Sequence, residues 1–286
     1  MKTVLFWDID GTLLTTGRAG MFAWEEAASE LVGRSIDLQR LSTAGLTDFA
    51  VGRSILELLK LPLDRDVLVR MVRSYETRLP AALPRRKGRV FQGVAEVLRY
   101  ARDERTDVTS HLLTGNTAAG ARAKLSYYGI WDLFSGGAFA EEPDTRVDIA
   151  RRALRTITNR QSISLDRVFV IGDTPHDVAC GKAIGAKTIA VATGSFTASE
   201  LREYDPWQTW ETVPDPPSFF FDVKHWREST ESWLSMRHVI RRFPRLWRMT
   251  RLLRRWYHAR RNAYPEWNEL LEDGKALWEM ARTRSA

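Results

Sequence analysis

The sequence has too little cysteine and too few uninterrupted apolar residues for several classes of protein. Cys180 is its one cysteine, so no disulfide can form within the chain. No apolar run approaches the roughly 20 residues that a membrane-spanning helix requires. Acidic residues interrupt the apolar stretch that begins at Thr3, unlike the pattern of a signal peptide. We therefore expect a cytoplasmic protein.

The first 222 residues have almost no net charge, whereas the remainder of the chain is strongly basic. Residues 1–222 carry 28 Lys and Arg against 29 Asp and Glu, and residues 223–286 carry 15 against 7. The overall net charge of +7 therefore belongs to the C-terminal segment. With 286 residues, 44% of them hydrophobic, the chain is long enough for one or two globular domains.

Strand and helix patterns alternate along most of the chain. The apolar run Thr3–Trp7 predicts a strand that is buried on both faces. After residue 88, predicted strands at 108–113, 168–171 and 188–192 alternate with predicted helices at 94–101, 118–128, 147–157 and 178–184. This alternation predicts a parallel α/β sheet with helices on both faces. Residues 219–221, three phenylalanines, are a last candidate strand.

Between the first strand and residue 88 the apolar residues recur at helical spacing. The pattern predicts three helices, around residues 22–31, 55–59 and 67–75. A basic link at 85–88 then leads back to the alternating strands and helices. We therefore expect an inserted all-helical unit.

Two pairs of carboxylates follow predicted strands of the sheet. Asp8 and Asp10 come directly after the first strand, and Asp173 and Asp177 follow a later one. Buried carboxylates are costly unless they are paired with a cation, and four of them together favour a divalent cation with oxygen ligands. Magnesium is the ion we expect. Taken singly, Asp10 could be a turn residue and Asp177 a helix cap.

Three sequence motifs resemble those of the haloacid dehalogenase-like superfamily, in the same order and at similar spacing. They are Asp8-Ile9-Asp10-Gly11-Thr12-Leu13, Leu113-Thr114-Gly115-Asn116 and Ile171-Gly172-Asp173-Thr174-Pro175-His176-Asp177. The helical insertion resembles the cap of phosphoglycolate phosphatase-like members. The resemblance implies a catalytic core at 1–14 and 89–222, a cap at 15–88 and a basic helical extension at 223–286.

The resemblance also implies roles for the motif residues. Asp8 would be the nucleophile that is transiently phosphorylated, and Asp10 the general acid and base. Magnesium would be held by Asp8, the backbone carbonyl of Asp10, Asp173 and Asp177. Thr114 would donate a hydrogen bond to a phosphoryl oxygen.

Further residues are expected to bind substrate. In the core, Gly11 and Thr12 form a turn whose backbone N–H groups can face an anion. Gly115 and Asn116 are expected to bind substrate because they belong to the second resembling motif. In the cap, Thr47 and Asp48 resemble a loop that faces the substrate, although a helix N-cap explains these two residues equally well.

The chain departs from the family pattern at the third motif, which is a lysine before the fourth motif. Residues 141–148 contain no lysine. Arg146 could supply the missing cation, or Lys124 could do so from the preceding helix. The alternative for each is an exposed residue on the surface of a helix.

The basic extension combines arginine with tryptophan. Residues 232–265 contain ten arginines and no acidic residue, with apolar side chains at roughly helical spacing. This pattern is typical of a helix that binds an anionic membrane surface, which would make the protein peripheral at the membrane. Nucleic acid is a second possible partner, and packing on the body or on a second subunit is the third interpretation. The oligomeric state stays open.

The expected function is hydrolysis of a small phosphate monoester, with phosphoglycolate or a sugar phosphate as the first candidates. A phosphomutase of the same superfamily is one alternative. The other is a binding protein that acts through its basic C-terminal segment.

Overall fold

The computed structural model describes residues 2–159 and 162–224. A first compact unit spans Met1–Phe220, and the fold below is that of this unit. The predicted basic segment at 232–265 lies outside the described residues, so its expected contacts stay predictions. Within the described part of the chain, no helix is both long and apolar enough to cross a bilayer.

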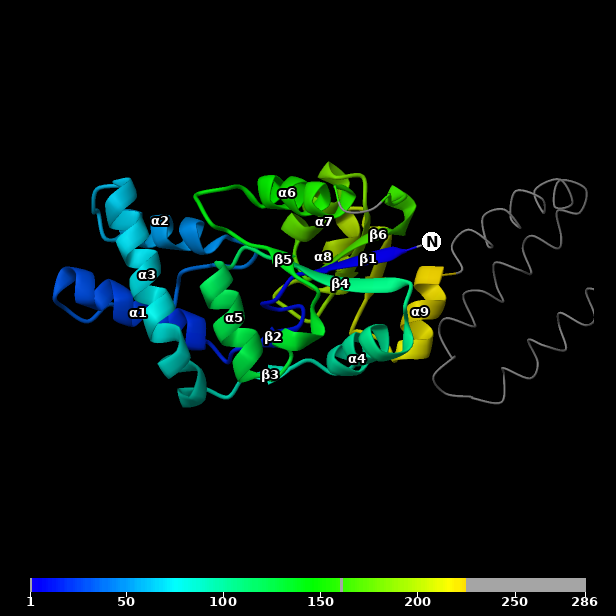
Figure 1. The fold of residues 1–286 in the computed structure, drawn as a ribbon. Helices are drawn as coiled ribbons and strands as arrows, with labels where there is room; N and C mark the ends of the chain where they lie inside the picture. The colour runs from blue at the N-terminus through cyan, green and yellow to red at the C-terminus, as the bar shows by residue number, and fades with distance from the viewer. Residues whose placement is uncertain (1, 160–161, 225–286) are drawn as a thin grey trace, which may run out of the picture. The chain divides into compact units, whose positions relative to one another are not determined.

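Six parallel strands form the central sheet, as Figure 1 shows for several of them. In spatial order they are β5 (Gly137–Ala138), β4 (Val108–Leu113), β1 (Thr3–Trp7), β6 (Val168–Gly172), β7 (Lys187–Val191) and β8 (Gln208–Trp210). All five residues of β1 are buried, as its uninterrupted apolar run predicts for a central parallel strand. The expected fold class, a parallel α/β sheet, is confirmed.

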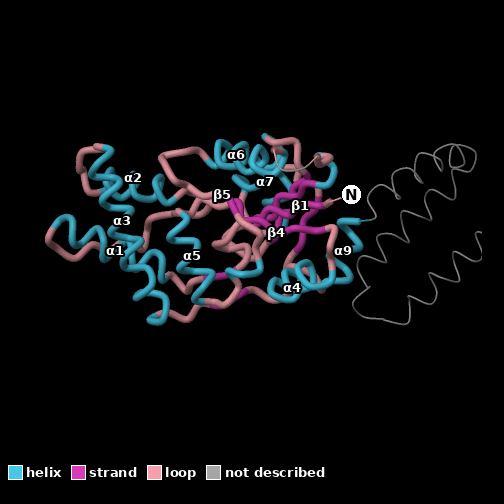
Figure 2. The backbone as a smooth tube through the Cα atoms, viewed as in Figure 1, coloured by secondary structure: helices cyan, strands magenta, loops and turns pink. Residues whose placement is uncertain are grey.

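Helices cover both faces of this sheet (Figures 1 and 2). On one face lie α6 (Arg146–Thr158) and α7 (Pro175–Ala183), and on the other lies α4 (Val94–Glu104). The remaining helices of the core are α5 (Ala118–Tyr127), α8 (Ala198–Glu203) and the short turns η2 (Trp131–Leu133) and η3 (Leu165–Arg167). The sheet and its helices bury a core to which Phe6, Leu113 and Val170 contribute.

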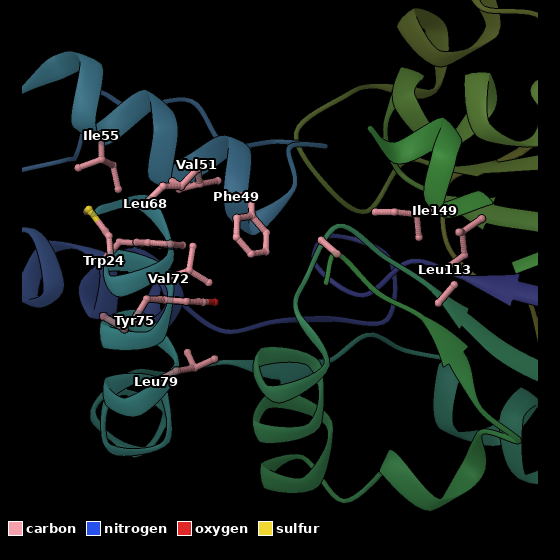
Figure 3. Packing of buried hydrophobic residues seen from close by; sticks show 14 of the residues in the cluster. Trp24, Phe49, Val51, Ile55, Leu68, Val72, Tyr75, Leu79, Leu113 and Ile149 are labelled. Atoms are coloured by element: carbon pink, nitrogen blue, oxygen red, sulfur yellow. The ribbon is translucent and has the colours of Figure 1, made fainter. Parts of the chain in front are cut away.

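The insertion is all-helical, as expected. It consists of α1 (Ala19–Val32), α2 (Asp48–Leu58), α3 (Arg65–Ala82) and the turn η1 (Leu83–Arg85). Figure 3 shows apolar side chains from all three helices meeting in one cluster, with Trp24, Ile55 and Leu68 among them. The cap helices therefore stabilise one another by burying a shared apolar core.

The chain crosses between core and cap through a small two-stranded sheet. β2 (Leu14–Thr15) pairs antiparallel with β3 (Arg89–Val90), so that Thr15 lies opposite Arg89. The segment that enters the cap and the segment that returns to the core therefore lie side by side.

The prediction of a strand at 219–221 is wrong. These residues belong to α9 (Pro216–Lys224), whose first residues are two prolines. Proline suits the first turn of a helix, because its fixed φ is helical and its missing N–H has no partner there anyway. Phe219 stacks on Trp7 at a centroid distance of 5.6 Å, so the apolar run packs as one helical turn.

Candidate active site

The loops that follow three strands meet at one edge of the sheet. Asp8 follows β1, Thr114 follows β4 and Asp173 follows β6. Because β1 lies between β4 and β6, this edge is where the strand order reverses, the usual place for a ligand in a parallel sheet. A cavity of about 510 Å³ is lined by these three residues and, from the cap, by Trp24 and Tyr75 among others.

Arg146 provides a buried cation beside Asp8. It is the first residue of α6, and its Nη2 atom lies 3.3 Å from Oδ1 of Asp8 and donates to Oδ1 of Asp177. The three side chains are between 3 and 9% exposed. Burial opposes the charge of Arg146, but Asp177 and Asp8 outweigh it and raise the pKa of the guanidinium. Arg146 is therefore not an exposed helix residue.

Three carboxylates lie close enough to share one cation. Oxygen atoms of Asp8, Asp173 and Asp177 all lie within 4.8 Å of one another. Burial raises the pKa of Asp8 to about 7 against the opposing charge of Arg146, and Asp177 and Asp10 raise it further. Burial, Asp177 and Asp8 raise the pKa of Asp173 well above its usual value. A hard divalent cation would relieve this repulsion, so the donor set fits magnesium.

The positions of Asp173 and Asp177 are fixed by their neighbours. Thr12 donates from Oγ1 to Oδ1 of Asp173 at 2.8 Å. Gly11 has a φ of +87°, and a Cβ atom there would lie 2.2 Å from Oδ2 of Asp173, so glycine is required for this approach. Asp177 also accepts from the backbone N–H of Thr174, as a helix cap does. Its capping and acidic-cluster interpretations are therefore compatible.

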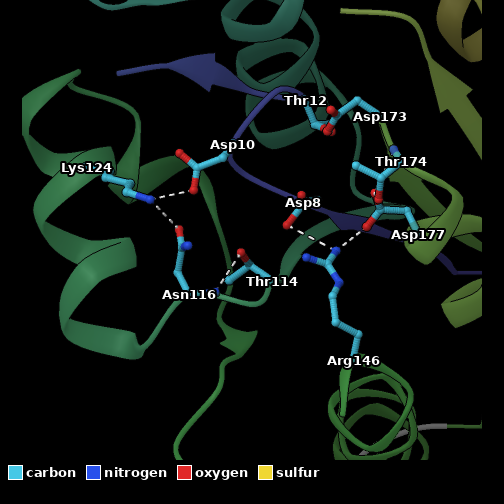
Figure 4. A network of polar contacts seen from close by, with 10 residues as sticks. All are labelled: Asp8, Asp10, Thr12, Thr114, Asn116, Lys124, Arg146, Asp173, Thr174 and Asp177. Carbon is cyan, nitrogen blue, oxygen red and sulfur yellow. Dashed lines mark hydrogen bonds and ion pairs between the residues drawn. The ribbon is translucent and has the colours of Figure 1, made fainter. Parts of the chain in front are cut away.

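Asp10 faces a second cation. Nζ of Lys124, on α5, lies 2.5 Å from Oδ2 of Asp10 and donates to Oδ1 of Asn116 at 3.1 Å. The Lys124 side chain is 4% exposed, whereas that of Asp10 is 44% exposed and lines the cavity. Figure 4 shows Asp8 and Asp10 directed toward different cations, Arg146 and Lys124 respectively.

The other predicted site residues divide into those that line the cavity and those behind it. Thr114, Asn116, Gly11 and Asp48 line it. Thr12, Gly115, Thr47 and Asp177 are outside its lining. Thr47 is the N-cap of α2 and accepts from the backbone N–H of Ala50, the alternative that the sequence left open. The substrate-binding roles of these residues stay predictions.

Sequence reasoning did not identify two aromatic cap residues that line the cavity. Trp24 on α1 and Tyr75 on α3 stack with their rings 4.1 Å apart and 2° from parallel, and both line the cavity. Helical spacing marks them only as core residues. The sequence offered one indication, the hydroxyl of Tyr75, because a tyrosine hydroxyl buried among apolar residues usually needs a hydrogen-bond partner.

Comparison with known proteins places this geometry in a family. The family model described as haloacid dehalogenase-like hydrolase matches residues 5–182, more than half of the chain. The chain belongs to this family. The resemblance of its motifs is thereby confirmed, and so is the expected enzyme class, a hydrolase of the phosphatase-like kind.

The relatives of this hydrolase include proteins described as phosphatases. A protein of Dickeya dadantii (strain 3937) named "Probable phosphatase IndB" is 27% identical over 211 residues, covering 72% of this chain and 88% of that protein.

Solved structures share the fold. A "predicted phosphoglycolate phosphatase" from Haemophilus somnus 129pt has a TM-score of 0.61 at 13% identity, over 77% of this chain and 98% of its own. CbbY from Rhodobacter sphaeroides, solved in complex with phosphate, has a TM-score of 0.57 at 16% identity, over 74% and 95%.

Proposed function

We propose that this hydrolase is a magnesium-dependent phosphatase that cleaves a small phosphate monoester through an aspartyl-phosphate on Asp8. The observation that carries the proposal is the surrounding of Asp8. Its buried carboxylate lies beside the Arg146 guanidinium and within 4.8 Å of the oxygens of Asp173 and Asp177, next to a cavity of small-molecule size. Such a site can hold an anionic phosphoryl group against a carboxylate nucleophile.

In the first step, an oxygen of Asp8 attacks phosphorus and the bond between phosphorus and the ester oxygen breaks. The departing alkoxide takes a proton from Asp10, which acts as the general acid. The position of Asp10 supports this role, because its side chain is the half-exposed member of its ion pair and faces the cavity.

In the second step, water attacks the phosphorus of the aspartyl-phosphate. Asp10, now ionised, takes a proton from that water, inorganic phosphate leaves, and Asp8 is free again. Arg146 balances negative charge beside Asp8 throughout. Thr114 donates to a phosphoryl oxygen, a role supported by its position in the cavity lining.

Asp8, Asp173 and Asp177, with the backbone carbonyl of Asp10, would hold magnesium. When bound, the ion supplies positive charge against the phosphoryl oxygens. Its identity is supported by the oxygen-only donor set and by the mutual repulsion of the buried carboxylates.

The substrate class is a small phosphorylated metabolite. The cavity of about 510 Å³ has room for one, and relatives described as a phosphatase and a phosphoglycolate phosphatase support the same class. Phosphoglycolate and small sugar phosphates are therefore the first esters to test.

The test is release of inorganic phosphate from p-nitrophenyl phosphate and a panel of small phosphate esters, with and without magnesium. Wild type should turn over only with magnesium. Asp8→Asn should lose activity by a factor of at least about 1,000, because it removes the nucleophile. Asp132→Asn, the same change on the exposed turn η2, should retain activity.

Other outcomes point to the alternatives. Little free phosphate together with a requirement for a bisphosphate activator would indicate a phosphomutase. No turnover on any ester, with binding of the full-length protein to anionic liposomes or oligonucleotides, would indicate a binding protein that acts through residues 232–265.

A further inference from the structure

Lys124 is buried between the catalytic core and the cap. It contacts Asp10 and Asn116. Two cap residues, Asp48 and Tyr75, lie beside the same face of α5: a Cβ atom at Gly120, one helical turn before Lys124, would lie 3.3 Å from Oδ2 of Asp48 and 3.7 Å from Cε1 of Tyr75. Lys124, Asp48 and Tyr75 are 3%, 4% and 1% exposed. Burial opposes the ammonium charge, but Asp10, Tyr75 and Asp48 outweigh it and raise the pKa of Lys124. The charge of Lys124 therefore depends on groups from both parts of the protein.

Asp48 joins the cap to the core through two short hydrogen bonds. Its backbone N–H donates to the carbonyl of Gly115 at 2.7 Å, and its Oδ2 accepts from the backbone N–H of Thr117, also at 2.7 Å. A Cβ atom at Gly115 would lie 2.6 Å from the carbonyl oxygen of Leu46. The start of α2 therefore sits directly on the loop that leads into α5, the helix that carries Lys124.

Tyr75 belongs to the cap and packs among the cap helices. Its ring stacks on that of Trp24, and it belongs to the apolar cluster that α1, α2 and α3 share. A tyrosine in such surroundings moves with the cap helices. Its ring lies against Gly120 of α5, one turn before Lys124, only with the cap in its observed place on the core.

We propose that Asp48 and Tyr75 are positioning residues that hold Lys124, and through it the Asp10 carboxyl, in place for proton transfer with the cap seated. A buried ammonium group requires hydrogen-bond or charged partners, and a change in one partner alters the positions of the others in the network. With Asp48 and Tyr75 in place, Lys124 holds one oxygen of Asp10 while the half-exposed carboxyl faces the leaving group. Seating of the cap on the core thus fixes the position of the Asp10 carboxyl. The inference rests on the proposed phosphatase function.

The test uses leaving groups that differ in their need for a proton. Tyr75→Phe and Asp48→Asn should each lower kcat/KM for an alkyl phosphate such as glycerol phosphate by about tenfold or more, because alkoxides need general-acid help. For p-nitrophenyl phosphate, whose leaving group needs little help, kcat/KM should fall by less than about threefold. The comparison uses kcat/KM because the later hydrolysis of the aspartyl-phosphate is the same step for both esters. Tyr100→Phe on α4 and Asp64→Asn at the N-cap of α3 make the same chemical changes outside the cavity lining.

Equal losses of kcat/KM for both esters, or no loss for either, would overturn the proposal, because in the first step positioning of the acid acts on the alkyl ester selectively. Thermal unfolding of each variant checks that it is folded. If one of the two variants does not fold, the other carries the test.

A second measurement does not depend on turnover. In the full-length protein, the side-chain carboxyl ¹³C resonance of Asp10, assigned with Asp10→Asn, should move in Tyr75→Phe and Asp48→Asn and stay in place in both controls. An unmoved resonance would overturn the coupling even in an active phosphatase. A moved resonance in a protein without phosphatase activity would leave the coupling standing and reject the proposed function.

Discussion

The site contains two buried cations, and they differ in where their partners come from. Arg146 contacts Asp8 and Asp177, and all three belong to the core. Lys124 contacts Asp10 in the core and interacts with Asp48 and Tyr75 in the cap. The cation beside Asp8, the proposed nucleophile, is therefore held by the core, whereas the cation beside Asp10, the proposed general acid, lies among residues of both core and cap. A change in the cap should therefore affect proton transfer by Asp10 more than nucleophilic attack by Asp8.

The largest effect is expected from removing the contacts of Arg146 with Asp8 and Asp177. Arg146→Met leaves Asp8 and Asp177 buried without their cation, which should lower the free energy of unfolding by about 3–5 kcal/mol in metal-free protein. Magnesium should restore part of this loss. Urea unfolding with and without magnesium measures both. Arg151→Met, which removes an exposed pair on the same helix, is the control and should change stability little. Equal stability of the two variants would contradict the description of Arg146.

The next effect concerns the shared cluster and depends on pH. Burial raises the pKa of Asp48 from 3.8 to about 6 in spite of Lys124. Between these values the unfolded chain binds fewer protons than the folded protein, so rising pH destabilises the fold. Asp48→Asn removes this contribution.

The stability of Asp48→Asn relative to wild type should therefore increase as the pH rises from about 4 to about 7, by up to about 3 kcal/mol. Unfolding by urea at several pH values measures the change, with Asp64→Asn as the matched variant. A difference that is the same at pH 4 and pH 7 would show that Asp48 is not held in this buried setting.

A third variant displaces the cap loop without changing a charge. Gly115→Ala places a Cβ atom 2.6 Å from the carbonyl oxygen of Leu46 and 2.9 Å from Cα of Thr47, so the cap loop must shift, while Nη1 of Arg146, at 3.2 Å, needs to give only slightly. Turnover of an alkyl phosphate should fall on the order of 100-fold, since small misplacements of catalytic groups cost that much. Turnover of p-nitrophenyl phosphate should fall less. Kinetics with the two esters give the comparison, and a larger loss on the nitrophenyl ester would contradict it.

The smallest expected effect is on magnesium binding by the carboxylates of the core, Asp8, Asp173 and Asp177. Because the pKa of Asp8 is raised to about 7, protons compete with the metal below that pH. Magnesium affinity should rise by about tenfold or more between pH 6 and pH 8, because Asp8 and Asp173, whose pKa values are both raised, must lose their protons to bind the ion. Calorimetric titration at pH 6 and pH 8 measures this. Asp48→Asn should bind magnesium as wild type does, and a weakened affinity there would remove the distinction between the clusters.

The sequence predicted those parts of the fold and site that depend on local pattern. The buried run before Asp8 and the acidic residues after two strands defined the sheet, its ligand-binding edge and the family. The two cations considered for the missing lysine both proved to be buried, Arg146 beside Asp8 and Lys124 beside Asp10. Their catalytic roles stay predictions.

What the sequence could not predict depends on packing between distant segments. Tyr75 and Trp24 follow helical spacing like any core residue, and only the placement of the cap brings them to the cavity. The run at 219–221 is too short for periodicity to separate strand from helix. Two prolines at the helix start and the stacking on Trp7 decided it.

The pairing of Thr15 with Arg89 has a consequence for how such enzymes diversify. The chain leaves the core and returns to it at directly opposed positions, so the junction constrains only the separation of two ends and not the length or contents of what lies between them. A different helical insertion with similarly spaced ends could replace the present one while every strand of the large sheet keeps its register. A chimera built at this junction would retain the proposed hydrolytic chemistry if the new insertion supplies residues that do what Asp48 and Tyr75 do beside Lys124.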